Sequence, residues 1–192
     1  MRFIKLVAGL AVALNSAWAL ADWQLNNDQS NLTFVSTKAG NIAEVHHFKQ
    51  LGGGISGNQA NVTIDLASID SLIPIRDDRM KAMLFNVEKF AEASISASVD
   101  MSAFEAMANG DSNQMSLDAA LNLHGETSAM AIQAVATKLS DTRLMVTSWQ
   151  PVIVNAATFK LAEGVEKLRE VAGLPAISQS VPVSFVLVFE KK

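Results

Sequence analysis

Charged side chains gather in one apolar stretch of the sequence, residues 71–85 (SLIPIRDDRMKAMLF). Arg76 and Asp77 stand near its centre, between isoleucine, methionine, leucine and phenylalanine residues. Such groups can fix a loop by hydrogen bonds to one another or to backbone carbonyls. Alternatively, the guanidinium of Arg76 can contact a polar group of a bound molecule, for which its planar geometry is well suited. The sequence leaves both interpretations of Arg76 open.

The three histidines are the next candidates for chemistry. His46 and His47 are adjacent in a predicted strand, so their side chains should leave on opposite faces. They would make a poor shared metal site, and His124 lies far along the chain beside a predicted turn. A zinc site needs three or four converging ligands, and no spacing here supplies them. The sequence therefore favours a structural or surface role for each histidine.

Motifs for nucleophilic catalysis and phosphate binding are not matched. Residues 54–57 (GISG) have the wrong spacing for a serine nucleophile elbow. Residues 52–54 (GGG) precede no lysine-threonine pair and no helix, so we interpret them as a hairpin turn rather than a phosphate loop. Cysteine is absent, which excludes a thiol nucleophile and a disulfide. We expect neither an enzyme nor a cofactor.

Strands, predicted from the alternation of apolar and polar residues, are the main elements that must position the charged residues and histidines. In 115–123 (MSLDAALNL) every odd-numbered residue is apolar, which predicts a strand with one buried face. Similar patterns predict strands at 32–34, 43–49, 62–66, 94–99, 130–136, 144–149 and 181–189. About eight such strands favour an all-β fold with antiparallel neighbours in a barrel or sandwich.

One segment, 161–173 (LAEGVEKLREVAG), follows a helical pattern instead. Leu161, Val165 and Leu168 recur at helical spacing, and a glycine and a proline mark the end. A second short helix is expected around 79–85. The fold class is therefore all-β with one or two short helices.

The N-terminus has the parts of a secretory signal peptide. Arg2 and Lys5 are followed by an apolar run, 6–14 (LVAGLAVAL), that is too short to span a bilayer. We expect 1–21 to be removed and 22–192 to form a single exported domain. The exported chain is more acidic than the net charge of −4 of the whole sequence, so no nucleic-acid partner is expected.

The stretch quoted at the outset resembles the YceI-like family of periplasmic polyisoprenoid-binding proteins. The family's strongest motif is a strand with Ser-Ile-Asp, then an Arg-Asp segment leading to Leu-Phe; here it reads 66–71 (LASIDS), 76–80 (RDDRM) and 84–85 (LF). Weaker matches occur at Trp23, 30–34, 48–53 and 122–126, so the resemblance spans nearly all of 22–192. The sequence departs from the family at His46, where many members have glycine, and in a longer stretch at 161–176.

The resemblance implies an elongated eight-stranded antiparallel barrel, similar to that of lipocalins, in the periplasm. It would hold a long isoprenoid, a prenyl-tailed quinone or a fatty amide. Eight strands can close around one ligand, and eight to ten residues at about 3.3 Å each give a tube about 30 Å long. Each buried methylene contributes about 0.8 kcal/mol, so a dozen carbons give roughly 10 kcal/mol before ordering losses. The expected function is a non-catalytic carrier or reservoir of an isoprenoid lipid.

The predicted site combines strand alternation with a segment, 73–85, that crosses one barrel end. Ligand-binding side chains are expected at Phe34, His46, Phe48, Ile64, Leu66, Ile73, Ile75, Arg76, Met80, Met83, Phe85, Leu121, Trp149 and Leu168. Arg76 would contact a quinone carbonyl or a diphosphate, or only fix the crossing loop. Flexible methionines suit either a lipid cavity or an ordinary core; beyond the signal peptide they are Met80, Met83, Met101, Met107, Met115, Met130 and Met145.

Several alternatives stay open. The barrel interior could be filled by its own side chains, which would make the protein structural or partner-binding. Less favoured is an enzyme acting on an isoprenoid head, with His46 or His124 as base. The predicted helix at 161–172 is either a lid or a plug. Besides an isoprenoid lipid or another long-chain amphiphile, the sequence is compatible with transient membrane contact and with a homodimer through an exposed edge strand.

Overall fold

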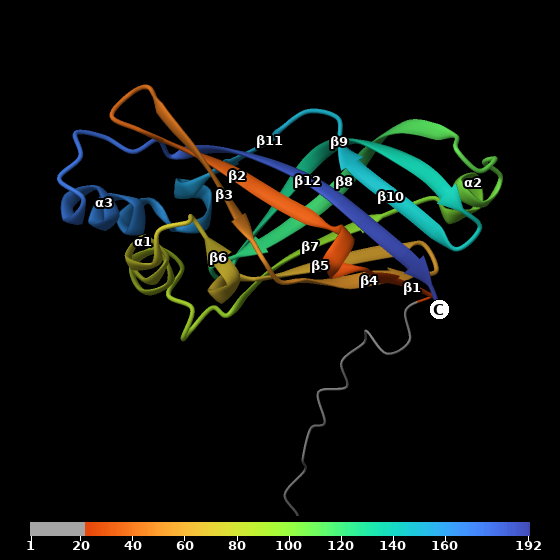
Figure 1. Cartoon of the computed structure of the whole chain (residues 1–192), viewed down its shortest axis with the longest axis horizontal. Helices are drawn as coiled ribbons and strands as arrows, with labels where there is room; N and C mark the ends of the chain where they lie inside the picture. Colours follow the sequence, from red (N-terminus) through yellow and green to blue (C-terminus); the bar gives the residue numbers. More distant parts are fainter. Residues whose placement is uncertain (1–21) are drawn as a thin grey trace, which may run out of the picture.

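The computed structural model describes residues 22–192, and the predicted signal peptide lies outside them. Strands dominate, and short helices lie at the two ends of the long axis (Figure 1). The strands are β1 (Trp23–Leu25), β2 (Asn31–Lys38), β3 (Ile42–Phe48), β4 (Leu51–Ser56), β5 (Gln59–Asp65), β6 (Ile69–Asp70), β7 (Glu92–Ser98), β8 (Ser112–Leu123), β9 (Glu126–Ser140), β10 (Arg143–Ser148), β11 (Val152–Asn155) and β12 (Ser180–Lys191). The helices are α1 (Pro74–Arg79), the π-helical segment η4 (Met80–Phe85), α2 (Met101–Glu105) and α3 (Ala162–Val171), and short 3-10 turns are η2 (Asn27–Gln29), η3 (Leu66–Ser68) and η5 (Ala156–Phe159).

Eight strands close into an antiparallel barrel, which confirms the predicted fold class. They follow the order β1-β4-β5-β7-β8-β9-β10-β12, and β1 pairs again with β12. At this seam Trp23 lies opposite Lys191, and Leu25 lies opposite Phe189. The first half of β12 pairs instead with β11 on one side and β2 on the other, and β3 and β6 follow β2. The long strand β12 therefore contributes to the wall along the length of the barrel.

The alternation in β8 shows why the sequence forms this wall. Leu121 and Leu123 are buried, whereas Asp118 and Asn122 face solvent. The same rule separates the two adjacent histidines, as predicted: His46 is only 2% exposed, while the side chain of His47 is about one third exposed. Apolar residues on one face of each strand thus become the barrel interior.

The glycines at 52–54 belong to strand β4 rather than to the predicted hairpin turn. Gly53 lies opposite Val62 of β5. A Cβ atom added to Gly53 would lie 2.2 Å from the carbonyl oxygen of Asn61, and its φ angle is +125°. Glycine is required here because the two backbones approach so closely. The turn that joins β4 to β5 lies at 57–58.

Helices occupy the two ends of the barrel. At one end α1, η4 and α3 pack together, and at the other lies α2, which the sequence did not predict (Figure 1). The predicted helix at 161–173 is confirmed as α3. A Cβ atom added to Gly164 would lie 2.7 Å from the carbonyl oxygen of Met83, so this glycine lets α3 contact the backbone of η4. The helix expected at 79–85 begins earlier, at Pro74, and continues as η4.

None of the helices in residues 22–192 combines the length and the apolar character needed to cross a lipid bilayer.

Candidate functional site

Two apolar cavities lie end to end inside the barrel. The α3-side chamber has a volume of about 160 Å³ and is bounded partly by Leu161 and Val165. The α2-side chamber has a volume of about 90 Å³. Ile95, Ile132 and Phe185 line both chambers, so the two spaces adjoin along the barrel, and they are together called the channel below.

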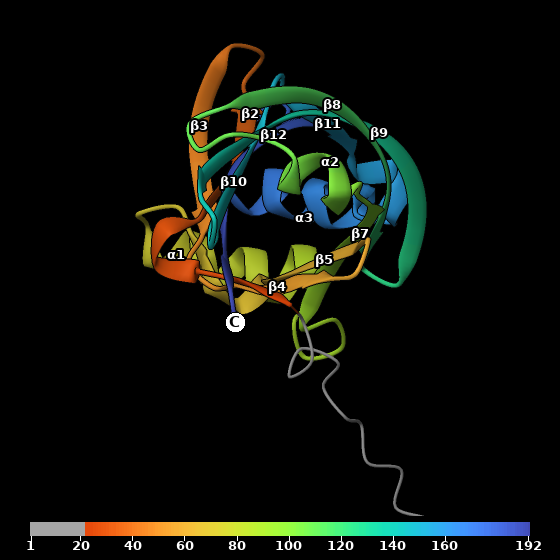
Figure 2. The same cartoon turned by 90° about the vertical axis from the view of Figure 1, so that its right-hand side faces the viewer.

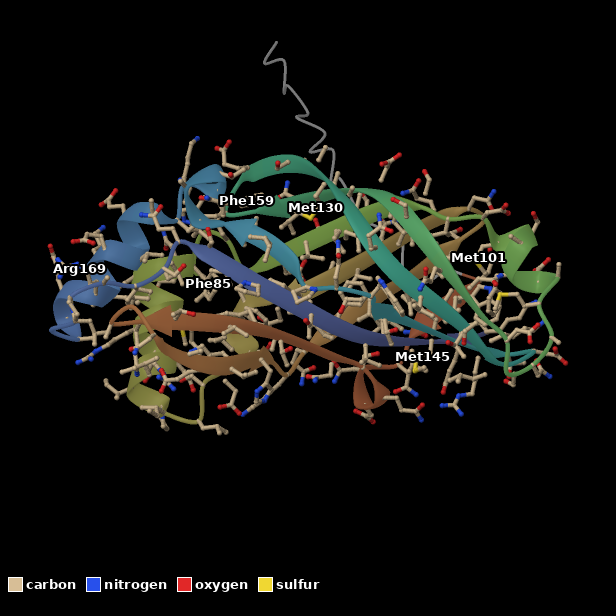
Figure 3. The ribbon with its side chains drawn as sticks, turned by 90° about the horizontal axis from the view of Figure 1, so that it is seen from above. Phe85, Met101, Met130, Met145, Phe159 and Arg169 are labelled. Atoms are coloured by element: carbon tan, nitrogen blue, oxygen red, sulfur yellow. The ribbon has the colours of Figure 1, made fainter. Side chains whose placement is uncertain are left out.

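The wall of the α3-side chamber contains much of the predicted site. Inward-facing positions of β2, β3, β5 and β8, together with the turns η3 and η4, supply these side chains. They are Phe34, Phe48, Ile64, Leu66, Phe85 and Leu121. Figure 3 shows Phe85 near the helical end and Met130 nearer the middle of the barrel, and both line this chamber. The lining residues are all apolar, so the chamber suits a hydrocarbon chain.

A polar pocket of about 170 Å³ adjoins this chamber beneath α3. The two spaces share four lining residues, Phe34, Leu84, Val165 and Val181. The polar pocket is further lined by five ionisable side chains and several apolar ones, among them Lys38, Glu44, His46, Arg76, Arg79, Met80 and Leu168. The structure therefore places the predicted His46, Arg76, Met80 and Leu168 together, next to the end of the apolar channel.

The guanidinium of Arg76 both lines this pocket and fixes the loop before α1. Its Nε donates to Ser71 Oγ at 2.8 Å, and its Nη2 donates to the Ser71 carbonyl at 2.7 Å. Its Nη1 donates to Glu44 of β3 at 2.7 Å. The buried carboxylate of Asp77 accepts from the Ser71 backbone N–H at 2.8 Å. The structural interpretation of Arg76 and Asp77 is thus visible in the geometry, although the two side chains bind Ser71 rather than each other.

Glu44 holds two cations at the rim of the polar pocket. Its Oε2 lies 2.7 Å from Lys38 Nζ and 2.7 Å from Arg76 Nη1. The hydrogen bond from Lys38, followed by the charge of Arg76, lowers the pKa of Glu44 below its usual value. Glu44 is therefore ionised at neutral pH and keeps both cations in place.

His46 lines the polar pocket and carries a buried, unpartnered nitrogen. Its ring packs edge-on against Phe34 with 5.3 Å between centroids, and its buried Nδ1 has no hydrogen-bond partner among the described residues. Burial, and then the nearby charge of Arg76, lower the pKa of His46, while the charges of Glu44 and Asp77 oppose this effect. His46 is therefore a neutral imidazole with hydrogen-bonding capacity to spare.

Four predicted lining residues line neither chamber and not the polar pocket, and the position of the helices explains three of them. Ile73, Ile75 and Met83 are 44%, 59% and 37% exposed, respectively. Ile73 is the N-cap of α1 and Ile75 lies in its first turn, and both side chains face solvent. Along η4 the wider π-helical turn brings Phe85, five residues after Met80, to the inner face and leaves Met83 outside.

Trp149 was also predicted wrongly. It is 63% exposed and lies just after the end of β10. The inward side chains of β10 are Leu144 and Val146, which line the α2-side chamber. Trp149 is out of phase with this alternation, so its ring faces away from the barrel interior.

The methionines divide between the channel and the rest of the molecule. Met101 and Met115 line the α2-side chamber, Met130 lines the α3-side chamber, and Met80 lines the polar pocket. Figure 3 places Met101 beside α2, at the far end from Arg169 on α3. Met107 packs against the core, whereas Met83 and Met145 do not line a cavity. Four of the seven methionines thus border the space that the sequence assigned to a flexible ligand.

Sequence reasoning missed two parts of the site. Glu44 shares the inward face of β3 with His46 and Phe48, so strand alternation could have revealed it. Helix α2 begins after Asp100, whose side chain accepts from the backbone N–H of Ala103. An aspartate at this position is a helix-start signal, but five residues are too few to show a helical period.

The described part of the chain contains no group of three or more His, Cys, Asp or Glu side chains that could hold a metal ion. His124 lies at the β8–β9 turn, where its ring packs on Phe90 with 4.3 Å between centroids. Both histidines that the enzyme alternative named are therefore packed against phenylalanine rings.

The sequence matches the model of the YceI-like domain over residues 23–189. A structure of a polyisoprenoid binding domain from Saccharophagus degradans, implicated in plant cell wall breakdown, is 36% identical to this chain. It has a TM-score of 0.88 and covers 90% of this chain and 99% of that one. Among curated proteins, none matches the sequence.

Two more distant structures share the fold. Burkholderia cenocepacia BcnA is 17% identical, with a TM-score of 0.66 over 85% of this chain and 98% of that one. The Campylobacter jejuni YCEI protein is 16% identical, with a TM-score of 0.56 over 77% of this chain and 85% of that one. The family model, the barrel and the apolar channel agree, and the chain belongs to the YceI-like domain family.

Proposed function

We propose that this protein binds a single long-chain isoprenoid lipid, a polyprenyl lipid or a prenylated quinone, and serves as its periplasmic carrier or reservoir. The observation that carries the proposal is the apolar channel formed by two adjoining chambers, with a polar pocket next to one of its ends. The prenyl tail lies in the channel and the head group in the polar pocket. The homologous polyisoprenoid binding domain of Saccharophagus degradans supports this class of ligand.

The walls of the channel supply the affinity. Each methylene buried from water contributes about 0.8 kcal/mol, and the tail loses part of this gain when it is ordered. Ile95, Ile132 and Phe185 make the walls of the two chambers continuous, so a tail can use both. A barrel filled by its own side chains would leave no such channel.

The polar pocket supplies recognition of the head. His46 offers a neutral imidazole with an unpartnered Nδ1, and Arg79 on α1 has no ion pair within residues 22–192. Three of the five N–H donors of Arg76 bind Ser71 and Glu44, so this guanidinium positions its neighbours. A carbonyl or hydroxyl group of the lipid head can hydrogen bond to His46.

The proposed function is binding without catalysis. A general base is normally oriented by a second group that hydrogen bonds to its other nitrogen. Neither His46 nor His124 has a side-chain partner of this kind at Nδ1 among the described residues. Within 22–192 there is also no cysteine that could act as a nucleophile.

Export is part of the proposal and rests on the signal-like sequence of 1–21. Cell fractionation of the native host, with the N-terminal residue of the purified protein determined, tests it directly. We expect the protein in the periplasmic fraction with its N-terminus at or near Asp22.

Ligand extraction tests the binding function. The protein should be purified from its native host without detergent, weighed by native mass spectrometry, and extracted with organic solvent for lipid analysis. We expect a complex with one prenyl-chain lipid per protein. A ligand-free mass, together with no uptake of added prenyl alcohols by the purified protein, would contradict the proposal.

A further inference from the structure

Helix α2 closes the end of the channel that lies opposite the polar pocket. Met101 and Phe104 of α2 both line the α2-side chamber, and they are 9% and 5% exposed. Seen from this end of the molecule, α2 lies across the opening of the strand ring (Figure 2). The channel therefore meets a wall of two large apolar side chains.

Two interactions fix the backbone of α2 in this position. At its start, the carboxylate of Asp100 accepts from the backbone N–H of Ala103 at 3.1 Å. At its end, Lys138 Nζ donates to the carbonyl oxygens of Glu105 at 3.1 Å and Met107 at 3.0 Å. Lys138 is only 8% exposed, so these hydrogen bonds are shielded from solvent.

The ring of Phe104 is held on two sides. Trp23 of β1 packs edge-on against it with 5.5 Å between centroids, and Lys138 Nζ lies 5.7 Å from its centroid. A buried aromatic ring with such neighbours sits in a rotamer minimum of a close-packed interior. The wall is thus a fixed part of the barrel core rather than a loose loop.

The chemistry of the two ends fixes the direction of a bound lipid. The α3 end offers ionisable groups and the unpartnered His46. Asp100 is the only polar residue among those lining the α2-side chamber, and its carboxylate already accepts from Ser102 and Ala103. A polar head therefore lies at the α3 end, and the last carbons of the tail point toward α2.

We propose that Met101 and Phe104 set the maximum tail length that the protein accepts. This inference rests on the proposed lipid-binding function and adds its length specificity. A tail that reaches Phe104 is in contact with apolar side chains along the full length of the two chambers. A longer tail must leave part of its chain in water or fold back, so further carbons add no affinity.

A chain-length series tests the proposal. The delipidated protein is titrated with prenyl alcohols that differ by one isoprene unit, and displacement of a fluorescent fatty-acid probe gives each affinity. In the unaltered protein we expect affinity to rise with length and then to stop rising at a limit. In Phe104→Ala the limit moves to longer chains, and the first chain beyond the original limit binds roughly tenfold more tightly.

A second variant moves the limit in the other direction. Ala136 lines the same chamber and is 3% exposed, so Ala136→Leu adds side-chain volume there and should shorten the accepted chain. Phe90→Ala is the matched control, because Phe90 packs on His124 and lines neither chamber. We expect Phe90→Ala to leave the maximum accepted chain length unchanged. If Phe104→Ala does not fold, Met101→Ala and Ala136→Leu give the same comparison.

The outcomes separate the two proposals. If the unaltered protein binds no prenyl alcohol of any length, both the function and the length limit fail. If it binds them but the limit is the same in Phe104→Ala, Met101→Ala and Ala136→Leu, the length proposal alone is overturned. Faster probe exchange in Phe104→Ala without a shift of the limit would make α2 an entrance, which also overturns it.

Discussion

Arg76 of α1 donates a hydrogen bond to Glu44 of β3 at 2.7 Å, and this contact joins the helical end of the barrel to its wall. The same guanidinium donates twice to Ser71. One side chain thereby holds the loop, the helix and the strand that surround the polar pocket. The concentration of charges in 71–85 is explained first by this structural role.

Replacing Arg76 should destabilise the fold. Arg76→Leu removes three hydrogen bonds and leaves the carboxylate of Glu44 paired only with Lys38. We expect the free energy of unfolding to fall by about 1–3 kcal/mol, because hydrogen bonds to charged groups are lost. Urea denaturation followed by circular dichroism measures this.

Arg79→Leu is the control for that substitution. Arg79 lines the same pocket but makes no ion pair within the described chain, so its loss should change the free energy of unfolding by less than about 0.5 kcal/mol. Equal stability of Arg76→Leu and Arg79→Leu would show that the contacts of Arg76 do not hold the loop.

The buried His46 should make stability depend on pH. Because burial lowers its pKa in the folded state below the usual value of 6.5, the unfolded chain binds a proton more readily than the folded one. Stability is therefore full above about pH 6.5 and falls as the pH drops from there toward the lower pKa of the folded state. The loss should be visible between pH 7 and pH 5, above the range in which Glu44 titrates.

The matched variants are His46→Phe and His47→Phe. We expect His46→Phe to reduce the slope of unfolding free energy against pH over this window, since it removes the titrating group and an unpartnered Nδ1. His47→Phe, on the opposite strand face, leaves His46 in place and shows separately what the contact of His47 with Asp70 at 3.5 Å contributes. A slope unchanged by His46→Phe would show that another group controls stability there. Urea unfolding at several pH values provides the comparison.

A larger side chain at the junction of the chambers should block lipid binding. Ile95 lines both chambers, so Ile95→Phe narrows the channel at its middle. We expect long-chain affinity to fall at least tenfold, with an overpacking cost of about 1–3 kcal/mol in unfolding free energy. The control is Ile153→Phe on β11, where the side chain is 60% exposed. It should change neither the long-chain affinity nor the free energy of unfolding. Undiminished long-chain binding by Ile95→Phe would refute a continuous channel.

The glycines of β4 give a test of the strand geometry. Gly53→Ala would place a Cβ atom 2.2 Å from the Asn61 carbonyl oxygen, and we expect it to cost about 2–4 kcal/mol of stability. Gly57 also has a positive φ, but no atom lies within 4 Å of an added Cβ. Gly57→Ala should therefore cost only about 1 kcal/mol. Thermal unfolding of the two variants compares them, and similar melting temperatures would argue against the close approach of β4 and β5.

Much of the barrel could be predicted because burial in a strand alternates with a period of two. The odd-numbered residues of 115–123 illustrate this, since their inward placement follows from parity alone. Trp149 was misplaced because its position is out of phase with Leu144 and Val146, the inward residues of β10. Residues 52–54 were predicted as a turn from their glycines, and this was wrong because glycine marks both turns and close strand contacts.

Helical segments limited the prediction of the site. The inner face of 73–85 depends on where α1 begins and on the π-helical turn, and the sequence shows neither clearly. Ile73, Ile75 and Met83 were misplaced for this reason. The partners of Arg76 required the tertiary structure, since Glu44 lies on a distant strand. Helix α2 is held by the distant Lys138, a contact that no local pattern reveals.

The seam between Trp23–Leu25 and the last strand has a consequence for folding kinetics. These residues pair with Phe189–Lys191, which lie almost the whole described chain away. The hydrogen bonds that close the barrel therefore join residues with the largest sequence separation in the fold. Barrels dominated by such non-local pairings fold in milliseconds to seconds. Distant segments must first meet, at a cost in chain entropy, before their contacts can offset that cost. The circle cannot be completed until the ribosome has made β12, and a nascent chain lacking this strand has no finished wall with which to enclose a hydrocarbon.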